Sequence, residues 1–344
     1  MDELDKAIKA LNKKFGGNYI TRGTQVLDND YKRNSTGIFA LDFATGGGIP
    51  ERKVVMIAGK ESSGKTSSGI TTTAEVQKKG GKVAWVDTEH SLDPIWAAKF
   101  GVNFEELIVA QANTIEEASD TIETLILTGE LDLIVFDSLA ATASKAELEA
   151  SAEQKSMGGN AKAIGLMMRK ITARLNDNEN PVKTSVLLIN QLRENVAGWG
   201  APEYLPGGRQ LLYQTDIIVW LRPDSEPVGG KENPQGIRVK FKVTKNRTFP
   251  PLKIGHYDLL FEGRIDNNKS IAESAVIFGI VKKAGPWYSF GEFKASGLDN
   301  FMDTIKPKML DSIKEQVVKV MTKPPKELKP LEEPKPDELK MEVK

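Results

Sequence analysis

Hydrophobic positions follow a helical period at the start of the chain. They recur three or four residues apart, at Leu4, Ile8, Leu11 and Phe15. The pair Gly16-Gly17 follows directly, and glycine readily ends a helix because it adopts left-handed backbone conformations at little cost. The pattern therefore predicts an amphipathic N-terminal helix that ends at these glycines.

Between about residues 35 and 266, apolar runs with the length of strands alternate with stretches of helical pattern. The runs cover residues 54–57, 82–87, 131–137, 185–190, 217–221 and 239–243. Nearly continuous apolar strands that are separated by helices indicate a mostly parallel sheet with helices on both faces. We therefore predict an α/β fold with a twisted, mostly parallel sheet as the core of the protein.

The pattern changes beyond residue 266, where short helices are expected around Gly285-Pro286-Trp287-Tyr288. We predict a small C-terminal α/β domain over residues 267–322, in addition to an N-terminal segment over residues 1–34 and a core over residues 35–266. Prolines recur among alternating Lys and Glu in residues 323–344. This composition cannot bury a core, so it predicts a disordered tail.

Composition narrows the class of protein. The chain has 344 residues, 40% of them hydrophobic, which is enough for a sizeable core. Lys+Arg and Asp+Glu both number 47, which excludes a globally basic nucleic-acid binder but not a locally basic groove. Cysteine is absent, so disulfides and thiolate metal sites are excluded. The acidic start carries no signal-like apolar stretch, and we expect a cytoplasmic protein without a membrane partner.

One segment has the form G-x-x-x-x-G-K-[ST] of a phosphate-binding loop: Gly59-Lys60-Glu61-Ser62-Ser63-Gly64-Lys65-Thr66. An apolar strand precedes it and a helical pattern follows it, which is the order that such a loop requires. Its backbone N–H groups can surround phosphates, Lys65 can reach the terminal phosphates, and the Thr66 hydroxyl can bind Mg²⁺. The alternative is a solvent-facing Gly/Ser turn.

Three further strands end in polar side chains suited to nucleotide hydrolysis. Asp137 follows an apolar strand and can hold the magnesium shell through water, although it could instead cap the next helix. Glu89 comes just after another strand and can orient or deprotonate an attacking water, although a surface salt bridge is the alternative. Gln191 also ends a strand and can sense a γ-phosphate, or it can be a structural hydrogen-bonding residue.

These motifs together resemble the RecA family of homologous recombinases in order and spacing. The resemblance includes the phosphate loop, Asp87-Thr88-Glu89-His90-Ser91-Leu92-Asp93-Pro94, Val135-Phe136-Asp137-Ser138, Asn190-Gln191-Leu192-Arg193, Lys245-Asn246-Arg247 and Gly285-Pro286-Trp287-Tyr288-Ser289. It covers nearly the whole chain up to about residue 320. A generic P-loop ATPase would share only the phosphate loop and the strand that ends at Asp137.

The resemblance implies roles for individual residues. Glu89 would be the general base of ATP hydrolysis, Asp137 the acid of the Mg²⁺ shell together with Thr66, and Gln191 the γ-phosphate sensor. Ser67 would join the phosphate loop, and Asp93 and Trp96 would contact adenine. Lys245 and Arg247 would reach the nucleotide of a neighbouring subunit in a helical filament. In this reading ATP and Mg²⁺ are the cofactors and residues 1–34 take part in polymerisation.

The resemblance also implies two DNA-binding loops, at about residues 153–160 and 193–208. The residues expected to contact DNA supply backbone approach, charge or an apolar wedge: Met157, Gly158, Arg169, Arg193, Val196, Trp199, Gly207, Gly208 and Arg209. For Trp199 the alternative is an aromatic packed under a loop, and for the arginines it is ordinary solvated surface.

The chain departs from the family pattern at a few of these positions. Lys60 stands where the bacterial pattern has proline, which adds a charge beside the phosphates. Trp96 replaces a tyrosine, and Arg247 replaces a lysine.

The sequence as a whole indicates an ATP-dependent DNA recombinase. It would form filaments on single-stranded DNA and pair it with a homologous duplex for strand exchange in DNA repair. The alternatives are a ring-forming helicase motor on the same core and a non-catalytic mediator that uses ATP only to assemble. Together, Glu89 and Gln191 favour hydrolysis over the mediator.

Overall fold

The computed structural model describes residues 2–15, 20, 32–149, 159–177, 179–194 and 203–321. The predicted N-terminal helix is confirmed as α1 (Glu3–Phe15). The predicted tail over residues 323–344 lies outside the described residues. Within the described part of the chain, no helix is both long and apolar enough to cross a membrane.

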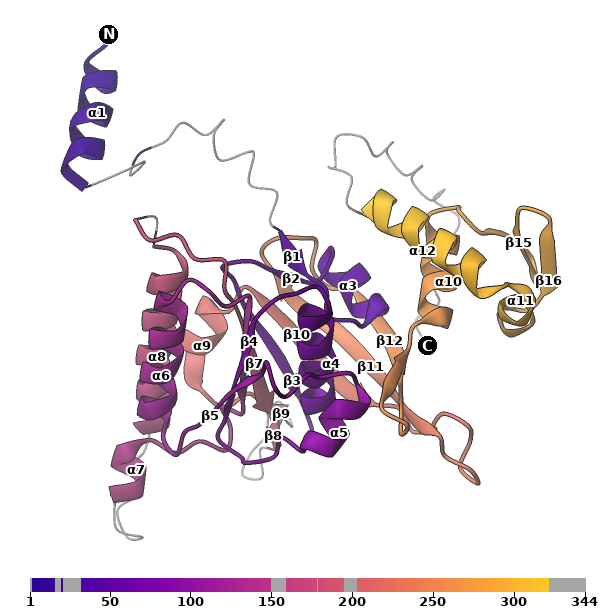
Figure 1. Ribbon diagram of the computed structural model, residues 1–344, viewed down its shortest axis with the longest axis horizontal. Coiled ribbons are helices and arrows are strands. Elements are labelled where there is room, and N and C mark those ends of the chain that lie inside the picture. Colours follow the sequence, from indigo (N-terminus) through magenta and orange to yellow (C-terminus); the bar gives the residue numbers. More distant parts are fainter. Residues whose placement is uncertain are drawn as a thin grey trace, which may run out of the picture.

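A nine-stranded sheet forms the core, in the order β13-β12-β11-β10-β3-β7-β6-β4-β5 (Figure 1). Its parallel part comprises β3 (Val54–Gly59), β4 (Val83–Asp87), β5 (Ile108–Gln111), β6 (Leu133–Asp137), β7 (Ser185–Gln191) and β10 (Ile217–Pro223). An antiparallel edge comprises β11 (Gly236–Asn246), β12 (Ile254–Leu260) and β13 (Arg264–Asp266). The predicted mostly parallel α/β sheet is therefore confirmed, and run 239–243 belongs to its antiparallel edge.

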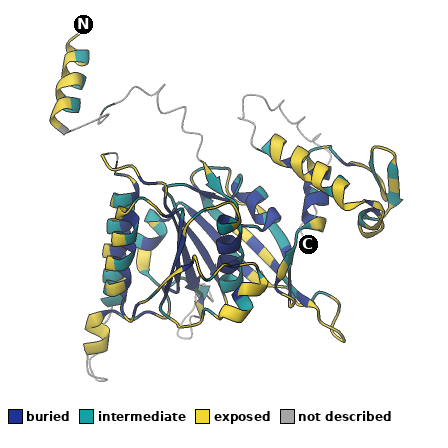
Figure 2. Ribbon diagram, in the orientation of Figure 1, coloured by how far each residue is buried: buried dark blue, intermediate teal, exposed yellow. Residues whose placement is uncertain are grey.

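Helices cover the two faces of this sheet, and the alternation of side chains along each strand explains why. Val55 and Ile57 of β3 pack in one hydrophobic cluster with α3 (Phe39–Thr45), α4 (Lys65–Lys78) and α5 (Pro94–Lys99). Val54 and Met56 pack in the other cluster with α6 (Ile115–Leu127), α8 (Gly159–Leu175) and α9 (Gly208–Gln214). Successive side chains of a strand point to opposite faces, so a strand buried on both faces is apolar throughout. Figure 2 shows these strands buried between the helical layers.

Short elements complete the core. They are β1 (Arg33–Asn34) paired with β2 (Ile49–Pro50), the helix α7 (Lys145–Glu149), and β8 (Arg193–Glu194) paired with β9 (Glu203–Tyr204). The two DNA loops expected from the sequence overlap in part with described elements. Asn160 lies in the first turn of α8, Gly208 begins α9, and residues 150–158 and 195–202 lie outside the described residues.

The C-terminal part of the described chain combines helices with a small sheet. It contains α10 (Asn268–Ile277), the strands β14 (Lys282–Ala284), β15 (Trp287–Phe290) and β16 (Phe293–Ser296), and then α11 (Leu298–Thr304) and α12 (Pro307–Met321). The short helices expected around residues 285–288 were therefore wrong for that segment, which forms antiparallel hairpins instead. Gly285 and Pro286 lie between the paired residues Ala284 and Trp287, so they form the two-residue turn of the first hairpin.

This C-terminal part also packs on the core. Phe39 of α3 shares a hydrophobic cluster with Phe301 and Ile313. The Asn267 side chain accepts a hydrogen bond from the Phe39 N–H at 2.9 Å and donates one to the Gly37 carbonyl at 2.8 Å. The domain boundaries at residues 34, 266 and 322 stay predictions.

Candidate functional site

The predicted phosphate loop joins the end of β3 to the start of α4 at the carboxyl edge of the sheet. Gly64 adopts a left-handed conformation with φ 82°, which favours glycine. A Cβ atom on Gly59 would lie 2.7 Å from the Leu221 carbonyl oxygen, so only glycine fits beside β10. The buried Ser63 hydroxyl donates to the Lys60 carbonyl at 2.7 Å and closes the loop on itself. The sequence order strand, loop and helix thus produces a compact turn over the N-terminus of α4.

Lys65 lies in the first turn of α4 and is partly buried. Its ammonium group donates to the Lys60 carbonyl at 2.6 Å. Burial lowers the pKa of Lys65, while the carboxylates of Asp137, Glu89 and Glu61 act in the opposite direction. These acids make the surroundings of the ammonium group negative, which favours its charged form.

Asp137 ends β6 and lies directly against Thr66. The Thr66 hydroxyl donates to Asp137 Oδ2 at 2.8 Å. The pKa of Asp137 is raised to about 7, chiefly by burial and also by the charges of Glu89 and Asp87, while the Thr66 hydrogen bond and Lys65 oppose the rise. Thr66 and Asp137 therefore bring a hydroxyl and a carboxylate oxygen together next to the phosphate loop. Oxygen ligands of this kind, completed by waters and phosphate, are what Mg²⁺ prefers, so these residues fit the ion.

Glu89 lies on the exposed turn that follows β4, and two residues that we did not assign from the sequence position it. The carboxylate of buried Asp87 accepts hydrogen bonds from the N–H groups of Glu89, at 3.1 Å, and Leu92, also at 3.1 Å. The Ser138 hydroxyl donates to Glu89 Oε1. Asp87 and Asp137 are opposite each other in register, so the turn after β4 lies beside the end of β6.

Of the predicted adenine-contacting residues, Trp96 lies on α5 and Asp93 directly precedes this helix. Asp93 Oδ1 accepts from the N–H groups of Ile95, at 2.7 Å, and Trp96, at 3.0 Å, and so caps the N-terminus of this helix. The Trp96 ring packs edge-on against Phe100 at 5.2 Å, and its indole Nε1 lies 3.5 Å from Ser67 Oγ. The structure thus brings Trp96 next to the first turn of α4 and gives Asp93 a structural contact that sequence spacing did not reveal.

Gln191 ends β7 directly opposite Gly59 of the phosphate loop. The next residue continues this contact, because the Leu192 N–H donates to the Gly59 carbonyl at 3.0 Å. The preceding residue, Asn190, is buried and donates to the Pro206 carbonyl at 3.0 Å. The end of β7 therefore contacts the phosphate loop on one side and the segment before α9 on the other.

Lys245 and Arg247 lie elsewhere, toward the amino ends of the parallel strands. Lys245 of β11 is opposite Ile218 of β10 in the sheet. Ile218 is in turn opposite Met56 of β3. Gly59 lies further along β3, about 10 Å beyond Met56 at the usual rise of a strand. The chain therefore does not bring these two cations to its own phosphate loop.

Backbone carbonyls near the end of α9 hold both cations. Lys245 Nζ donates to the Leu212 carbonyl at 2.6 Å, and Arg247 Nη2 donates to the Tyr213 carbonyl at 2.6 Å. Burial lowers the pKa of Lys245, Arg247 lowers it further, and Asp216 opposes the shift.

The predicted DNA-contacting residues that the structure describes lie on the helix α8, on the short strand β8, and at the start of the helix α9. Arg193 of β8 donates to the Ala140 carbonyl at 2.9 Å. Gly207 and Gly208 have φ of 111° and 76° at the start of α9, where exposed Arg209 follows. A Cβ atom on Gly208 would lie 3.2 Å from Ala161 of α8, and exposed Arg169 lies about two turns further along this helix. Met157, Gly158, Val196 and Trp199 lie outside the described residues.

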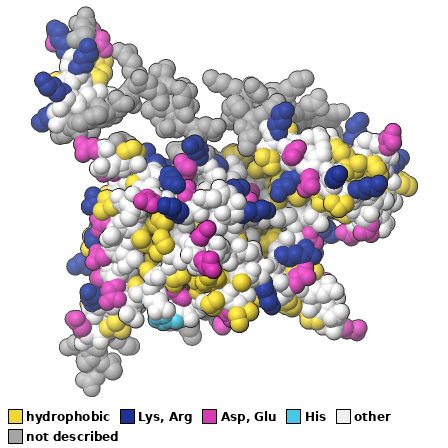
Figure 3. Space-filling view, viewed as in Figure 1, with side chains coloured by type: hydrophobic (Ala, Val, Ile, Leu, Met, Phe, Trp, Pro, Cys, Tyr) yellow, Lys and Arg dark blue, Asp and Glu magenta, His cyan; other side chains and the backbone are white. Residues whose placement is uncertain are grey.

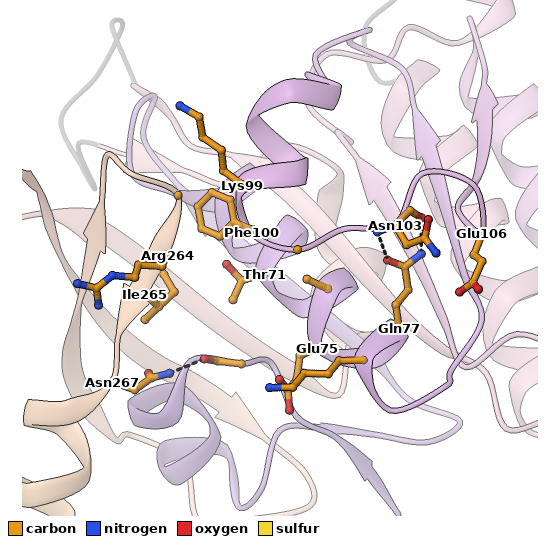
Figure 4. A pocket seen from close by; sticks show the side chains of 15 residues that line it. Thr71, Glu75, Gln77, Lys99, Phe100, Asn103, Glu106, Arg264, Ile265 and Asn267 are labelled. Atoms are coloured by element: carbon orange, nitrogen blue, oxygen red, sulfur yellow. Dashed lines mark hydrogen bonds between the residues drawn. The ribbon is translucent and has the colours of Figure 1, made fainter. Parts of the chain in front are cut away.

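Acidic and basic side chains are interspersed over the face seen in Figure 3. This agrees with the equal numbers of Lys+Arg and Asp+Glu, 47 each. A separate cavity of 560 Å³ lies along the later turns of α4 (Figure 4). In its lining, the Gln77 side chain exchanges hydrogen bonds of 2.9 and 3.0 Å with the backbone of Asn103. None of the residues predicted for the nucleotide site lines this cavity.

The phosphate loop joins the central parallel strand β3 to α4, and Asp137 ends β6, which is two strands away from β3 in the sheet. This arrangement defines a P-loop nucleotide-binding fold. The family model described as the RecA N-terminal domain matches residues 2–266. The chain is 35% identical over 320 residues to Protein RecA of Thermus thermophilus, covering 92% of this chain and 93% of the relative. It is 37% identical over 333 residues to Protein RecA of Chlorobaculum parvum, covering 95% and 94%. The chain belongs to the RecA family.

Proposed function

We propose that the protein is an ATP-dependent DNA recombinase. It would form helical filaments on single-stranded DNA, pair this strand with a homologous duplex and exchange strands in recombinational repair, in the cytoplasm of a bacterial or phage-infected cell. The observation that carries the proposal is the meeting of Lys65, Thr66, Asp137 and Glu89 at one edge of the sheet, because this set combines phosphate binding with activation of water.

Each residue of this set would have one task in hydrolysis. Lys65 would bind the terminal phosphates, and Thr66 and Asp137 would hold Mg²⁺, which would neutralise phosphate charge. Glu89, oriented by Ser138 and by the Asp87-held turn, accepts a proton from the attacking water. The water oxygen forms a bond to the γ-phosphorus while the bond to the β–γ bridging oxygen breaks, giving ADP and phosphate. Gln191 would respond to the γ-phosphate, and its position opposite Gly59 in the sheet supports this role.

The separation of Lys245 and Arg247 from the chain's own loop supports a role between subunits. Their position toward the other edge of the sheet suits contact with the nucleotide of a neighbouring copy in a filament. DNA would contact Arg169, Arg193, Gly207, Gly208 and Arg209, together with residues of the two predicted loops. Hydrolysis would then depend on DNA because DNA organises the interface between neighbours.

Electron microscopy with single-stranded DNA and a non-hydrolysable ATP analogue tests this proposal. A recombinase gives helical filaments whose length follows that of the DNA. Closed rings would instead support the helicase alternative. Filaments formed by a protein that hydrolyses no ATP, with or without DNA, would support the mediator alternative.

A further inference from the structure

The register of the sheet brings two cations side by side next to the phosphate loop. Gly59 of β3 is opposite Leu221 of β10 in a parallel pairing. Lys60 follows Gly59 and Arg222 follows Leu221, so the two cationic residues lie at neighbouring positions at the carboxyl edge of the sheet. Lys60 is also the residue that stands where the bacterial pattern of the family has proline.

Both cations contact the same carboxylate. Lys60 Nζ lies 3.0 Å from Glu203 Oε1, and Arg222 Nη2 lies 2.7 Å from Glu203 Oε2. The Glu203 side chain is only 11% exposed, whereas that of Lys60 is 45% exposed. Glu203 is therefore held firmly, while the ammonium group of Lys60 has the freedom to change partners.

Glu203 belongs to the segment that leaves the nucleotide site toward the predicted DNA contacts. It lies on β9, which pairs with β8, and β8 follows the end of β7 almost directly. Tyr204 of β9 is opposite Arg193 of β8. A change in the partners of Glu203 therefore acts on the β8–β9 pair.

We propose that Glu203 is a positioning residue for Lys60, and that Glu203 and the terminal phosphate of ATP compete for the Lys60 ammonium group. The carbonyl of Lys60 already lies 2.6 Å from Lys65 Nζ, so residue 60 borders the place where Lys65 meets the terminal phosphates. A phosphate is a dianionic, multidentate acceptor and competes well with one carboxylate. When Lys60 transfers to the phosphate, Glu203 keeps Arg222, and the β8–β9 pair loses one of its two ionic contacts at this residue.

The inference rests on the proposed nucleotide site and adds to it a residue that does not touch ATP. It predicts opposite signs for two neutral substitutions in the same ion-pair network. Glu203→Gln removes the competitor and tightens binding of ATPγS about threefold. Arg222→Met removes the other partner of Glu203, leaves the carboxylate to Lys60, and weakens ATPγS binding about twofold.

A double-mutant cycle tests the competition. The dissociation constants of ATPγS and ADP, each with Mg²⁺, are measured by equilibrium binding for wild type, Lys60→Met, Glu203→Gln and the double variant. We expect Lys60→Met to weaken ATPγS binding about threefold and to abolish the effect of Glu203→Gln. ADP binding should be unchanged in all four proteins, because ADP lacks the terminal phosphate.

Two controls separate this role from a merely structural one. Lys60→Arg retains the cation and should bind ATPγS like wild type. Glu130→Gln breaks the exposed Lys82–Glu130 pair, whose Nζ–Oε2 distance is 2.6 Å, far from the phosphate loop, and should change neither dissociation constant. If Glu203→Gln does not fold, two results still test the competition: weaker ATPγS binding in Lys60→Met but not in Lys60→Arg, and weaker ATPγS binding in Arg222→Met.

The outcomes distinguish failure of the inference from failure of the proposed function. A wild-type protein that binds no ATPγS would overturn both. A wild type that binds ATPγS normally, with a Glu203→Gln effect that persists in the Lys60→Met background or that is equal for ADP, would overturn the competition and leave the proposed function intact. A further expected result is that the ATP-dependent gain in affinity for single-stranded DNA is reduced in Lys60→Met, since coupling between two ligands is reciprocal.

Discussion

At the scale of single residues, the pKa of Asp137 links the candidate site to pH. Its carboxyl group is buried against Thr66, close to the carboxylates of Glu89 and Asp87, and its pKa is raised to about 7. A carboxyl group must be deprotonated to hold Mg²⁺ or its water shell, so under the proposed function protons would compete with the ion at this residue. The charged form dominates above pH 7 and the neutral form below it.

Affinity for Mg·ATPγS should therefore fall as the pH is lowered from 8 to 6. With a pKa of about 7 the deprotonated fraction of Asp137 falls about tenfold over this range, and the affinity should fall by about the same factor. Equilibrium binding at several pH values measures the effect. Asp137→Asn cannot titrate, so its weaker binding should be nearly independent of pH; an equally steep dependence in that variant would assign the effect to another group.

Glu89→Gln should separate ATP binding from hydrolysis. The amide keeps the size of the side chain and its hydrogen bond with Ser138, but it cannot accept a proton from water. We expect the DNA-dependent rate of hydrolysis to fall about 100-fold or more, with the affinity for ATP nearly unchanged. Phosphate release and nucleotide binding measured on the same preparation provide the comparison. Hydrolysis at the wild-type rate would show that Glu89 is not the base.

At the scale of helices and strands, part of the architecture could be predicted from the sequence. The strands buried on both faces were visible as apolar runs, and the phosphate loop was visible from the spacing of Gly59, Gly64 and Lys65. The edge strand β5 has only four residues, and a short apolar run such as residues 107–110 does not by itself distinguish a strand from part of a helix, so this strand was not predicted. The hairpins of β14–β16 were not predicted because their strands are only three or four residues long and partly exposed.

Contacts between distant residues could not be predicted in the same way. The Ser138–Glu89 hydrogen bond and the Lys60–Glu203 ion pair depend on the sheet register. The buried position of Asp87 carried a signal, since it is an acid at the end of an apolar run, but the direction of its side chain toward the turn at Leu92 did not. The sequence showed which strands end in candidate catalytic or binding residues. Only the fold showed which of these strand ends lie next to each other.

The cap of α5 gives a prediction about a whole element. Asp93→Ala removes both hydrogen bonds to the helix N-terminus and should lower the free energy of unfolding by about 1 kcal/mol, as measured by urea titration. Asp93→Asn keeps a good capping side chain and should preserve this stability. Any loss of ATP affinity in Asp93→Asn then reports contact with the nucleotide. Thr114→Ala, which removes the cap of α6, should lower stability without changing ATP affinity.

At the scale of the whole molecule, the nucleotide-binding set and the Lys245–Arg247 pair lie toward opposite edges of the same sheet. A single chain therefore has the two halves of the proposed hydrolytic site but does not join them. A head-to-tail assembly would join them at every interface and would leave free halves only at its ends. In the proposed filament, hydrolysis would therefore be a property of neighbouring subunits.

Mixing two inactive variants tests this arrangement. Lys65→Ala lacks the cation for the terminal phosphates, and Arg247→Ala lacks the cation supplied to a neighbour. In a mixed filament, some interfaces pair an intact phosphate loop with an intact Arg247, so ATP hydrolysis with single-stranded DNA should recover to about a quarter of the wild-type rate at equal amounts and random assembly. A mixture no more active than either parent would contradict action between subunits.

The central claim is that the protein exchanges homologous DNA strands, and a strand-exchange assay tests it most directly. Circular single-stranded DNA is incubated with a linear duplex, ATP and Mg²⁺, and the products are separated by gel electrophoresis. We predict joint molecules and then nicked circles with a homologous duplex, none with a heterologous duplex, and none with Lys65→Ala. Strand separation that is equally efficient for both duplexes, or ATP-dependent DNA binding without any joint molecules, would contradict the account.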